Sequence, residues 1–146
     1  MIIFRCDSSS WIGDGHIKRC LYLAKELRNR GEICEFITVD YEGNAIEEII
    51  SNGFKVRKIS RDLYKEKNIA EIDKCKREKI INLEADAQET INLLLERIPE
   101  YIIVDHYDLD INWEKIVKEF CKKIFVIDDL ANRKHDCDIL LDHNLK

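Results

Sequence analysis

The regular alternation of short apolar segments with longer amphipathic segments constrains the fold of this chain more than any other feature. Runs rich in β-branched residues predict strands over residues 2–6, 34–39, 55–59, 101–105, 124–127 and 139–141. Apolar residues at helical spacing predict helices near residues 15–30, 44–52, 85–97 and 112–121. Because strands that alternate with helices form a parallel sheet, we expect an α/β fold: an open parallel sheet with helices on both faces.

Residues that favour helix ends support these boundaries. Gly31 and Gly53 follow the first and second predicted helices, where glycine favours the left-handed conformation that ends a helix. The only proline, Pro99, follows the third helix and is expected to stop it, and Asp110 is suited to cap the fourth. The chain has the length of one ordinary domain, and we expect residues 1–146 to form a single one.

The composition argues against several classes of protein. The chain carries 24 basic and 29 acidic residues, whereas nucleic-acid-binding proteins present a basic face. No apolar run approaches the roughly 20 residues that cross a bilayer. The chain opens directly on a strand without a secretion signal, so we expect no membrane association and a cytoplasmic location. Six cysteines without a C-x-x-C pair are expected to be reduced thiols and not zinc ligands.

The highly charged stretch 61–82 interrupts the alternation of strands and helices. It lacks a sustained apolar stripe, which favours a surface excursion that is flexible or partly helical. Loops at strand ends of α/β domains also cover ligands, so that role is the open alternative.

A glycine-bearing turn joins the first predicted strand to the first helix. The start of a helix has unpaired backbone N–H groups that bind anions, and Gly13 and Gly15 permit close approach of the backbone to a ligand. His16 lies at the mouth of this turn, which suggests chemistry on a phosphorylated substrate. The Gly-Asp-Gly-His spacing lacks the full dinucleotide-binding and Walker A patterns. An ordinary strand–helix turn, with His16 bonded to nearby backbone, is therefore the alternative.

Polar side chains gather where the predicted strands end. Asp7 follows the first strand, Asp105 begins a cluster after the fourth, Asp128 and Asp129 follow the fifth, and Asp142 follows the last. The carboxyl ends of parallel strands lie along one edge of the sheet, where ligands bind. The aspartates after the fourth strand do not fit calcium-loop spacing, so we expect neither a metal ion nor a cofactor.

Four segments resemble a known family in their order and spacing. They are residues 12–24 (IGDGHIKRCLYLA), 104–110 (VDHYDLD), 126–131 (VIDDLA) and 135–144 (HDCDILLDHN). Together they resemble the UDP-2,4-diacetamido-2,4,6-trideoxy-β-L-altropyranose hydrolases of pseudaminic acid biosynthesis and similar proteins of spore coat polysaccharide biosynthesis. The resemblance implies a Rossmann-like domain, the N-terminal half of a glycosyltransferase-B-like arrangement. A C-terminal domain or a partner chain would then complete the cleft and grip much of the nucleotide.

The resemblance further implies hydrolysis of a UDP-sugar without a metal ion. Water attacks the anomeric carbon, UDP leaves, the configuration inverts, and His16 takes the catalytic position. The substrate-binding residues are then expected to be Asp7, Gly13, Asp14, Gly15, Arg19, Asp105, His106, Tyr107, Asp129 and Asn144. Arg19 is equally suited to contact the diphosphate or to form a surface ion pair. His143 stands where many relatives carry glutamine.

Physical chemistry supports a base at His16. The start of a helix carries about half a positive charge, which keeps imidazole neutral and able to accept a proton from water. A nearby carboxylate, Asp7 or Asp14, would act in the opposite direction by favouring imidazolium. The backbone over residues 13–15 would stabilise negative charge on sugar or diphosphate oxygens. Two other functions stay open: the N-terminal domain of a nucleotide-sugar glycosyltransferase, and a non-catalytic sugar-binding or partner domain.

Overall fold

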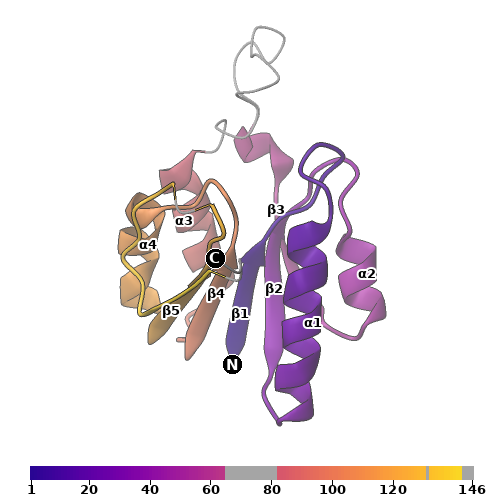
Figure 1. Cartoon of the computed structure of the whole chain (residues 1–146). Coiled ribbons are helices and arrows are strands. Elements are labelled where there is room, and N and C mark those ends of the chain that lie inside the picture. The colour runs from indigo at the N-terminus through magenta and orange to yellow at the C-terminus, as the bar shows by residue number, and fades with distance from the viewer. Residues whose placement is uncertain (65–81, 131, 143–146) are drawn as a thin grey trace, which may run out of the picture.

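The computed structural model describes residues 1–64, 82–130 and 132–142 of the chain. Six parallel strands form one open sheet in the order β3-β2-β1-β4-β5-β6 (Figure 1). The strands are β1 (Ile2–Cys6), β2 (Cys34–Val39), β3 (Lys55–Ile59), β4 (Tyr101–Asp105), β5 (Lys123–Ile127) and β6 (Ile139–Leu141). The expected Rossmann-like α/β sheet is confirmed, and only the start of β5, at Lys123, differs from the predicted strands.

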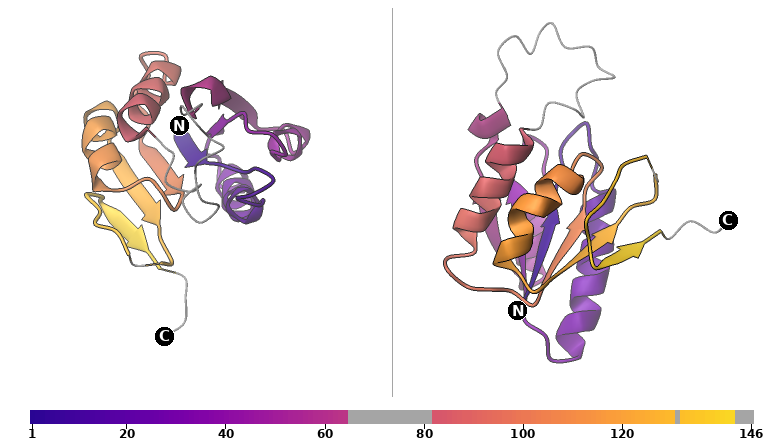
Figure 2. Two further views of the ribbon diagram at one scale, coloured as in Figure 1. Left: turned by 90° about the horizontal axis from the view of Figure 1, so that it is seen from above. Right: turned by 90° about the vertical axis from the view of Figure 1, so that its left-hand side faces the viewer.

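Helices cover both faces of the sheet, as the view from above shows (Figure 2). The helices are α1 (Gly15–Asn29), α2 (Ile46–Ser51), α3 (Leu83–Leu93) and α4 (Ile111–Val117). Successive side chains of a strand point to opposite faces, so each central strand contributes to two cores. Phe4 of β1 belongs to the core under α1 and α2, whereas its neighbour Ile3 belongs to the core under α3 and α4.

Three of the helices end or begin as their local signals predict. Gly31 and Gly53 follow α1 and α2 with φ angles of 90° and 88°, in the left-handed region that glycine favours. The Asp110 side chain caps α4 by accepting a hydrogen bond from the backbone of Asn112 at 2.9 Å. A 3₁₀ turn, η4 (Lys118–Phe120), continues α4 through most of the predicted helix.

The third helix is shorter than predicted, because α3 ends at Leu93 and not near residue 97. Leu95 and Glu96 have φ angles of 52° and 64°, and this left-handed backbone breaks the helix before Pro99 is reached. The prediction that Pro99 stops this helix is therefore wrong. Residues with bulky side chains rarely adopt such angles, so nothing in their identity indicates the break.

The chain changes its direction across the sheet between β1 and β4. The connection from β1 leads to β2 on one side, while β4 lies on the other side with Asp105 aligned with Cys6. The loops that follow two such strands lead to helices on opposite faces, and ligands of doubly wound sheets bind in the crevice between these loops. The loop from β1 to α1 and the loop from β4 to α4 therefore border the expected binding crevice.

The periphery of the sheet is less covered. The three residues of β6 are exposed at the open edge. A 3₁₀ turn, η1 (Arg61–Tyr64), follows β3, whereas residues 65–81, His143 and Asn144 lie outside the described residues. The described cysteines are free thiols. Among the described helices, none combines the length and the apolar character needed to cross a membrane.

Candidate active site

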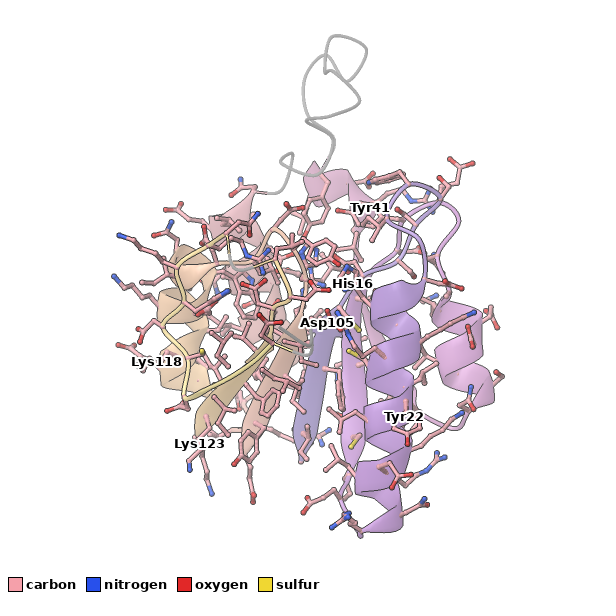
Figure 3. The ribbon with its side chains drawn as sticks, viewed as in Figure 1. His16, Tyr22, Tyr41, Asp105, Lys118 and Lys123 are labelled. Atoms are coloured by element: carbon pink, nitrogen blue, oxygen red, sulfur yellow. The ribbon has the colours of Figure 1, made fainter. Side chains whose placement is uncertain are left out.

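The first turn of α1 places His16 beside the end of β4, at the switch point of the sheet. The Nδ1 atom of His16 lies 2.6 Å from Oδ1 of Asp105. Figure 3 shows the two side chains together toward the carboxyl end of the sheet. His16 is 7% exposed and Asp105 is fully buried. His16 therefore bonds to the carboxylate of Asp105 at the end of β4. The alternative interpretation, in which His16 bonds to nearby backbone, is not what the structure shows.

Arg19, one helical turn after His16, holds the same carboxylate. Its Nε and Nη2 atoms donate to Oδ2 and Oδ1 of Asp105, both at 2.6 Å. Burial raises the pKa of Asp105, but the hydrogen bonds from His16 and Arg19 outweigh burial and hold the pKa below its ordinary value. Asp105 is therefore an ionised carboxylate that accepts a hydrogen bond from His16 Nδ1. Arg19 forms an ion pair, as one alternative predicted, but its partner is a buried aspartate and not a surface group.

The second ring nitrogen of His16, Nε2, lies on the side of the ring away from Asp105. A hollow of about 50 Å³ borders this ring, lined by Ile12, His16, His106, Tyr107 and Asp108. Its volume admits a few water molecules at roughly 10–15 Å³ each, and is far below the roughly 300–1,000 Å³ of small-molecule pockets. The Tyr107 ring meets the His16 ring edge-on, with centroids 4.5 Å apart. The arrangement allows an imidazole to take a proton from water.

The neighbouring histidine, His106, is held in the other tautomer. The backbone N–H of Asp108 donates to His106 Nδ1 at 3.0 Å, so this nitrogen carries no hydrogen. The other nitrogen, Nε2, lies 2.8 Å from Oδ2 of Asp7 and donates to it. Both ring nitrogens of His106 thus bond to the protein. The His106 ring therefore lines the hollow without a nitrogen left for a ligand.

A buried ionic network lies behind His106 and crosses the sheet. Asp7 accepts hydrogen bonds from Arg5 Nη1 at 2.7 Å and from the backbone of Val39 at 2.8 Å. Arg5 also donates through Nε to Asp86 of α3 at 3.2 Å, and Trp113 of α4 donates to the same carboxylate at 2.8 Å. Burial raises the pKa of Asp7, but the Arg5 and His106 side chains outweigh burial and hold it far below its ordinary value. Asp7 therefore anchors the floor of the site from within the core.

The loop before α1 is closed on itself. Gly13 donates to the backbone of Ser9 at 2.9 Å, and its φ of 81° is one that glycine adopts without strain. The first helical bond runs from the backbone N–H of Lys18 to Asp14 at 3.0 Å. The N–H groups of residues 15–17 therefore precede the helical ladder and are suited to anionic or carbonyl oxygens. Asp14 itself is exposed and pairs with Lys18 Nζ at 3.3 Å.

Asp129, in the loop after β5, reaches the site from the side of Tyr107. The Tyr107 hydroxyl donates to Asp129 Oδ2 at 3.5 Å, and Arg19 Nη1 lies 3.9 Å from the same oxygen. The adjacent Asp128 bonds instead to His135 at 2.7 Å. The two aspartates therefore take separate partners, as their adjacent positions in an extended segment predict.

The structure brings most of the predicted site residues together. A contacting group contains His16, Arg19, Asp105, His106, Tyr107 and Asp129. Gly13, Asp14 and Gly15 form the adjoining start of α1, and Asp7 lies beneath the hollow. Asn144 lies outside the described residues. Within the part of the chain that the structure describes, no group of three or more histidine, cysteine or acidic side chains is placed to hold a metal ion.

Reasoning from the sequence missed two features of the site. It assigned Asp105 to substrate binding and did not recognise it as the partner of His16. It also missed the link from Arg5 to Asp86, although an arginine inside an otherwise apolar strand is a signal for a buried ion pair.

The chain is similar to a nucleotide-sugar enzyme over nearly its whole length. It is 35% identical over 144 residues, 98% of the chain, to the UDP-2,4-diacetamido-2,4,6-trideoxy-beta-L-altropyranose hydrolase of Campylobacter jejuni. It is 31% identical over 125 residues, 84% of the chain, to an uncharacterized protein of Methanocaldococcus jannaschii. No family model matches the chain. The aligned regions cover 41% and 20% of these two relatives, so the chain spans less than half the length of either.

Proposed function

We propose that this chain forms one wall of a nucleotide-sugar hydrolase site and that this wall contains the catalytic base, His16. The observation that carries the proposal is the 2.6 Å contact between His16 Nδ1 and Asp105, beside a hollow of about 50 Å³ at the switch point. The 35% identity to the Campylobacter jejuni hydrolase supports it. The proposed substrate is a UDP-linked 2,4-diacetamido-2,4,6-trideoxy sugar, in pseudaminic acid or surface polysaccharide biosynthesis.

In the proposed reaction, His16 Nε2 accepts a proton from water while the water oxygen attacks the anomeric carbon. The bond from this carbon to the diphosphate oxygen breaks, its electron pair leaves with UDP, and the configuration inverts. Asp105 holds the hydrogen on Nδ1 and stabilises the imidazolium that forms. General-base catalysis of this kind contributes about 10²–10⁴-fold to the rate.

Inversion of configuration determines where the sugar and the diphosphate lie relative to His16. Water and leaving group lie on opposite faces of the sugar, so a base at His16 places the diphosphate away from the start of α1. The N–H groups of residues 15–17, which precede the first helical bond, then suit oxygens of the sugar and its substituents, and the diphosphate lies beyond the sugar. The hollow of about 50 Å³ is too small for a nucleotide, so most of the nucleotide binds outside it. A C-terminal domain or a partner chain is proposed to supply that part of the cleft.

A glycosyltransferase would use the same base on a sugar hydroxyl in place of water. Supplying the UDP-sugar without an acceptor separates the two activities. A hydrolase releases UDP and free sugar in equal amounts, whereas a transferase releases little of either. A non-catalytic binding domain would bind the UDP-sugar in calorimetry and release no UDP.

The test is His16→Asn, assayed for UDP release in ¹⁸O-labelled water with the protein at its natural length. Loss of a general base lowers kcat by about 10²–10⁴-fold, while binding of the UDP-sugar stays measurable. Glu26→Gln, an exposed change farther along α1, is the matched control and retains activity. UDP without label supports attack at carbon. Label in UDP, or near-normal turnover of His16→Asn, contradicts the proposal.

A further inference from the structure

The loop after β5 carries a further histidine, His135, whose side chain is 5% exposed. Its Nδ1 lies 2.6 Å from Oε2 of Glu114 in α4, and its Nε2 lies 2.7 Å from Oδ2 of Asp128. A neutral imidazole carries a hydrogen on one nitrogen only, so the two bonds require imidazolium or one protonated carboxyl. The ring fastens the loop to α4 on one side and to the end of β5 on the other.

The charges around His135 balance one another. Burial raises the pKa of Asp128, but hydrogen bonds from His135 and from the backbone of Leu130 outweigh burial and hold it below its ordinary value. Asp128 is therefore ionised, and it accepts the hydrogen bond from His135. Arg133, from the same loop, places Nη2 3.4 Å from Oδ1 of Asp128. This ion pair balances the charge of Asp128 and ties the Arg133 side chain to the anchor of the loop.

Besides the hydrogen bond from the Tyr107 hydroxyl to Asp129, two contacts connect this anchored loop to the loop after β4. Arg133 donates through Nη1 to the backbone oxygen of Tyr107. The backbone oxygen of Lys134 accepts from the N–H of Ile111, at the start of α4, at 2.9 Å. The loop after β4 is therefore held at both ends, with Tyr107 pressed edge-on against His16.

We propose that Arg133, anchored through His135, is a positioning residue of this site: it sets Tyr107 against the His16 ring and so fixes the direction of Nε2. Asp105 holds His16 at one ring atom only, which leaves the tilt of the ring to its neighbours. Tyr107 supplies that restraint, and Arg133 holds the backbone of Tyr107. The proposal rests on the proposed function for its effect on turnover, because misplacing a reacting group by about 1 Å costs up to roughly a hundredfold in rate.

The test compares two variants. Arg133→Met removes the ion pair with Asp128 and the hydrogen bond to the Tyr107 backbone, whereas Arg133→Lys keeps a positive charge beside Asp128. In Arg133→Met we expect kcat for UDP release to fall roughly 10- to 100-fold with KM nearly unchanged. The ring proton resonances of His16 should also move, because they lose the ring-current effect of Tyr107. Arg133→Lys should recover part of both. Lys123→Met, an exposed change at the start of β5, at the end of the sheet opposite the site, is the matched control and should change neither (Figure 3).

Unaltered His16 resonances in folded Arg133→Met would overturn the proposal, whatever its activity. If Arg133→Met does not fold, Arg133→Gln takes its place, and unaltered His16 resonances in that variant have the same meaning. A protein that releases no UDP but shows the resonance change in Arg133→Met contradicts the proposed function and supports the positioning role, so the two failures are distinguishable.

Discussion

Replacing Asp105 by asparagine tests the proposed chemistry most directly, because Asp105→Asn preserves shape and removes charge. In the parent protein, one Asp105 oxygen accepts from His16 Nδ1 and the carboxylate binds Arg19 through two bonds of 2.6 Å. An asparagine that turns its oxygen toward Arg19 points its amide N–H groups at His16 Nδ1. The imidazole then carries its hydrogen on Nε2 and cannot accept a proton from water.

The expected magnitudes follow from these contacts. A base held in the wrong tautomer loses its general-base contribution, so kcat should fall by about 10²–10⁴-fold. The free energy of unfolding should fall by about 1–3 kcal/mol, the cost of weakening charge-assisted hydrogen bonds to a buried carboxylate. The lower value is favoured, because the Arg19 side chain is 28% exposed and water solvates part of its charge.

Three measurements check this prediction. UDP release gives kcat, chemical denaturation gives the stability change, and ¹⁵N chemical shifts of the His16 ring report which nitrogen carries the hydrogen. Glu26→Gln makes the same carboxylate-to-amide change at an exposed position of α1 and should affect none of the three. An Asp105→Asn protein with the parent tautomer at His16 and parent turnover would refute the role assigned to this pair.

Two further predictions concern pH and metal ions. The pKa values of Asp7 and Asp105 are lowered on folding, so their contribution to stability is complete above the ordinary aspartate pKa of about 4 and is lost as pH falls through the folded values. The free energy of unfolding should therefore decrease below about pH 4, with a weaker decrease in Asp105→Asn; an equal pH dependence in both proteins would count against this. EDTA should leave UDP release unchanged, because the proposed proton acceptor is an imidazole, and a loss that magnesium restores would contradict this mechanism.

The bounds of the strands along the sequence could be predicted, apart from the start of β5, because each strand carries its own apolar signal. The end of α3 could not, because it depends on the left-handed backbone of Leu95 and Glu96, residue types that seldom adopt it. Helix ends marked by glycine, at Gly31 and Gly53, were predicted correctly for the opposite reason. Local sequence signals thus suffice to predict a helix end where the residue type favours the backbone conformation that ends the helix.

The site was predictable as a group of residues but not as a set of bonds. Parallel topology brings the residues after β1 and β4 to one edge, which is why His16 and Asp105 could be predicted to share a crevice. Their pairing depends on distances between loops, which no spacing in the sequence reveals. The same holds for Arg133 and Tyr107, which lie 26 residues apart and meet only in the folded chain.

The burial of Arg5 beneath the site restricts how this protein can change over evolutionary time. Its guanidinium is fully enclosed between Asp7 and Asp86. Replacing any one of these three residues would leave a buried charge without its partner, at a cost of about 3–5 kcal/mol. Descendants that replace this trio must do so by coordinated substitutions or through a compensated intermediate. The three positions should therefore vary together, or scarcely at all, among proteins that keep this core.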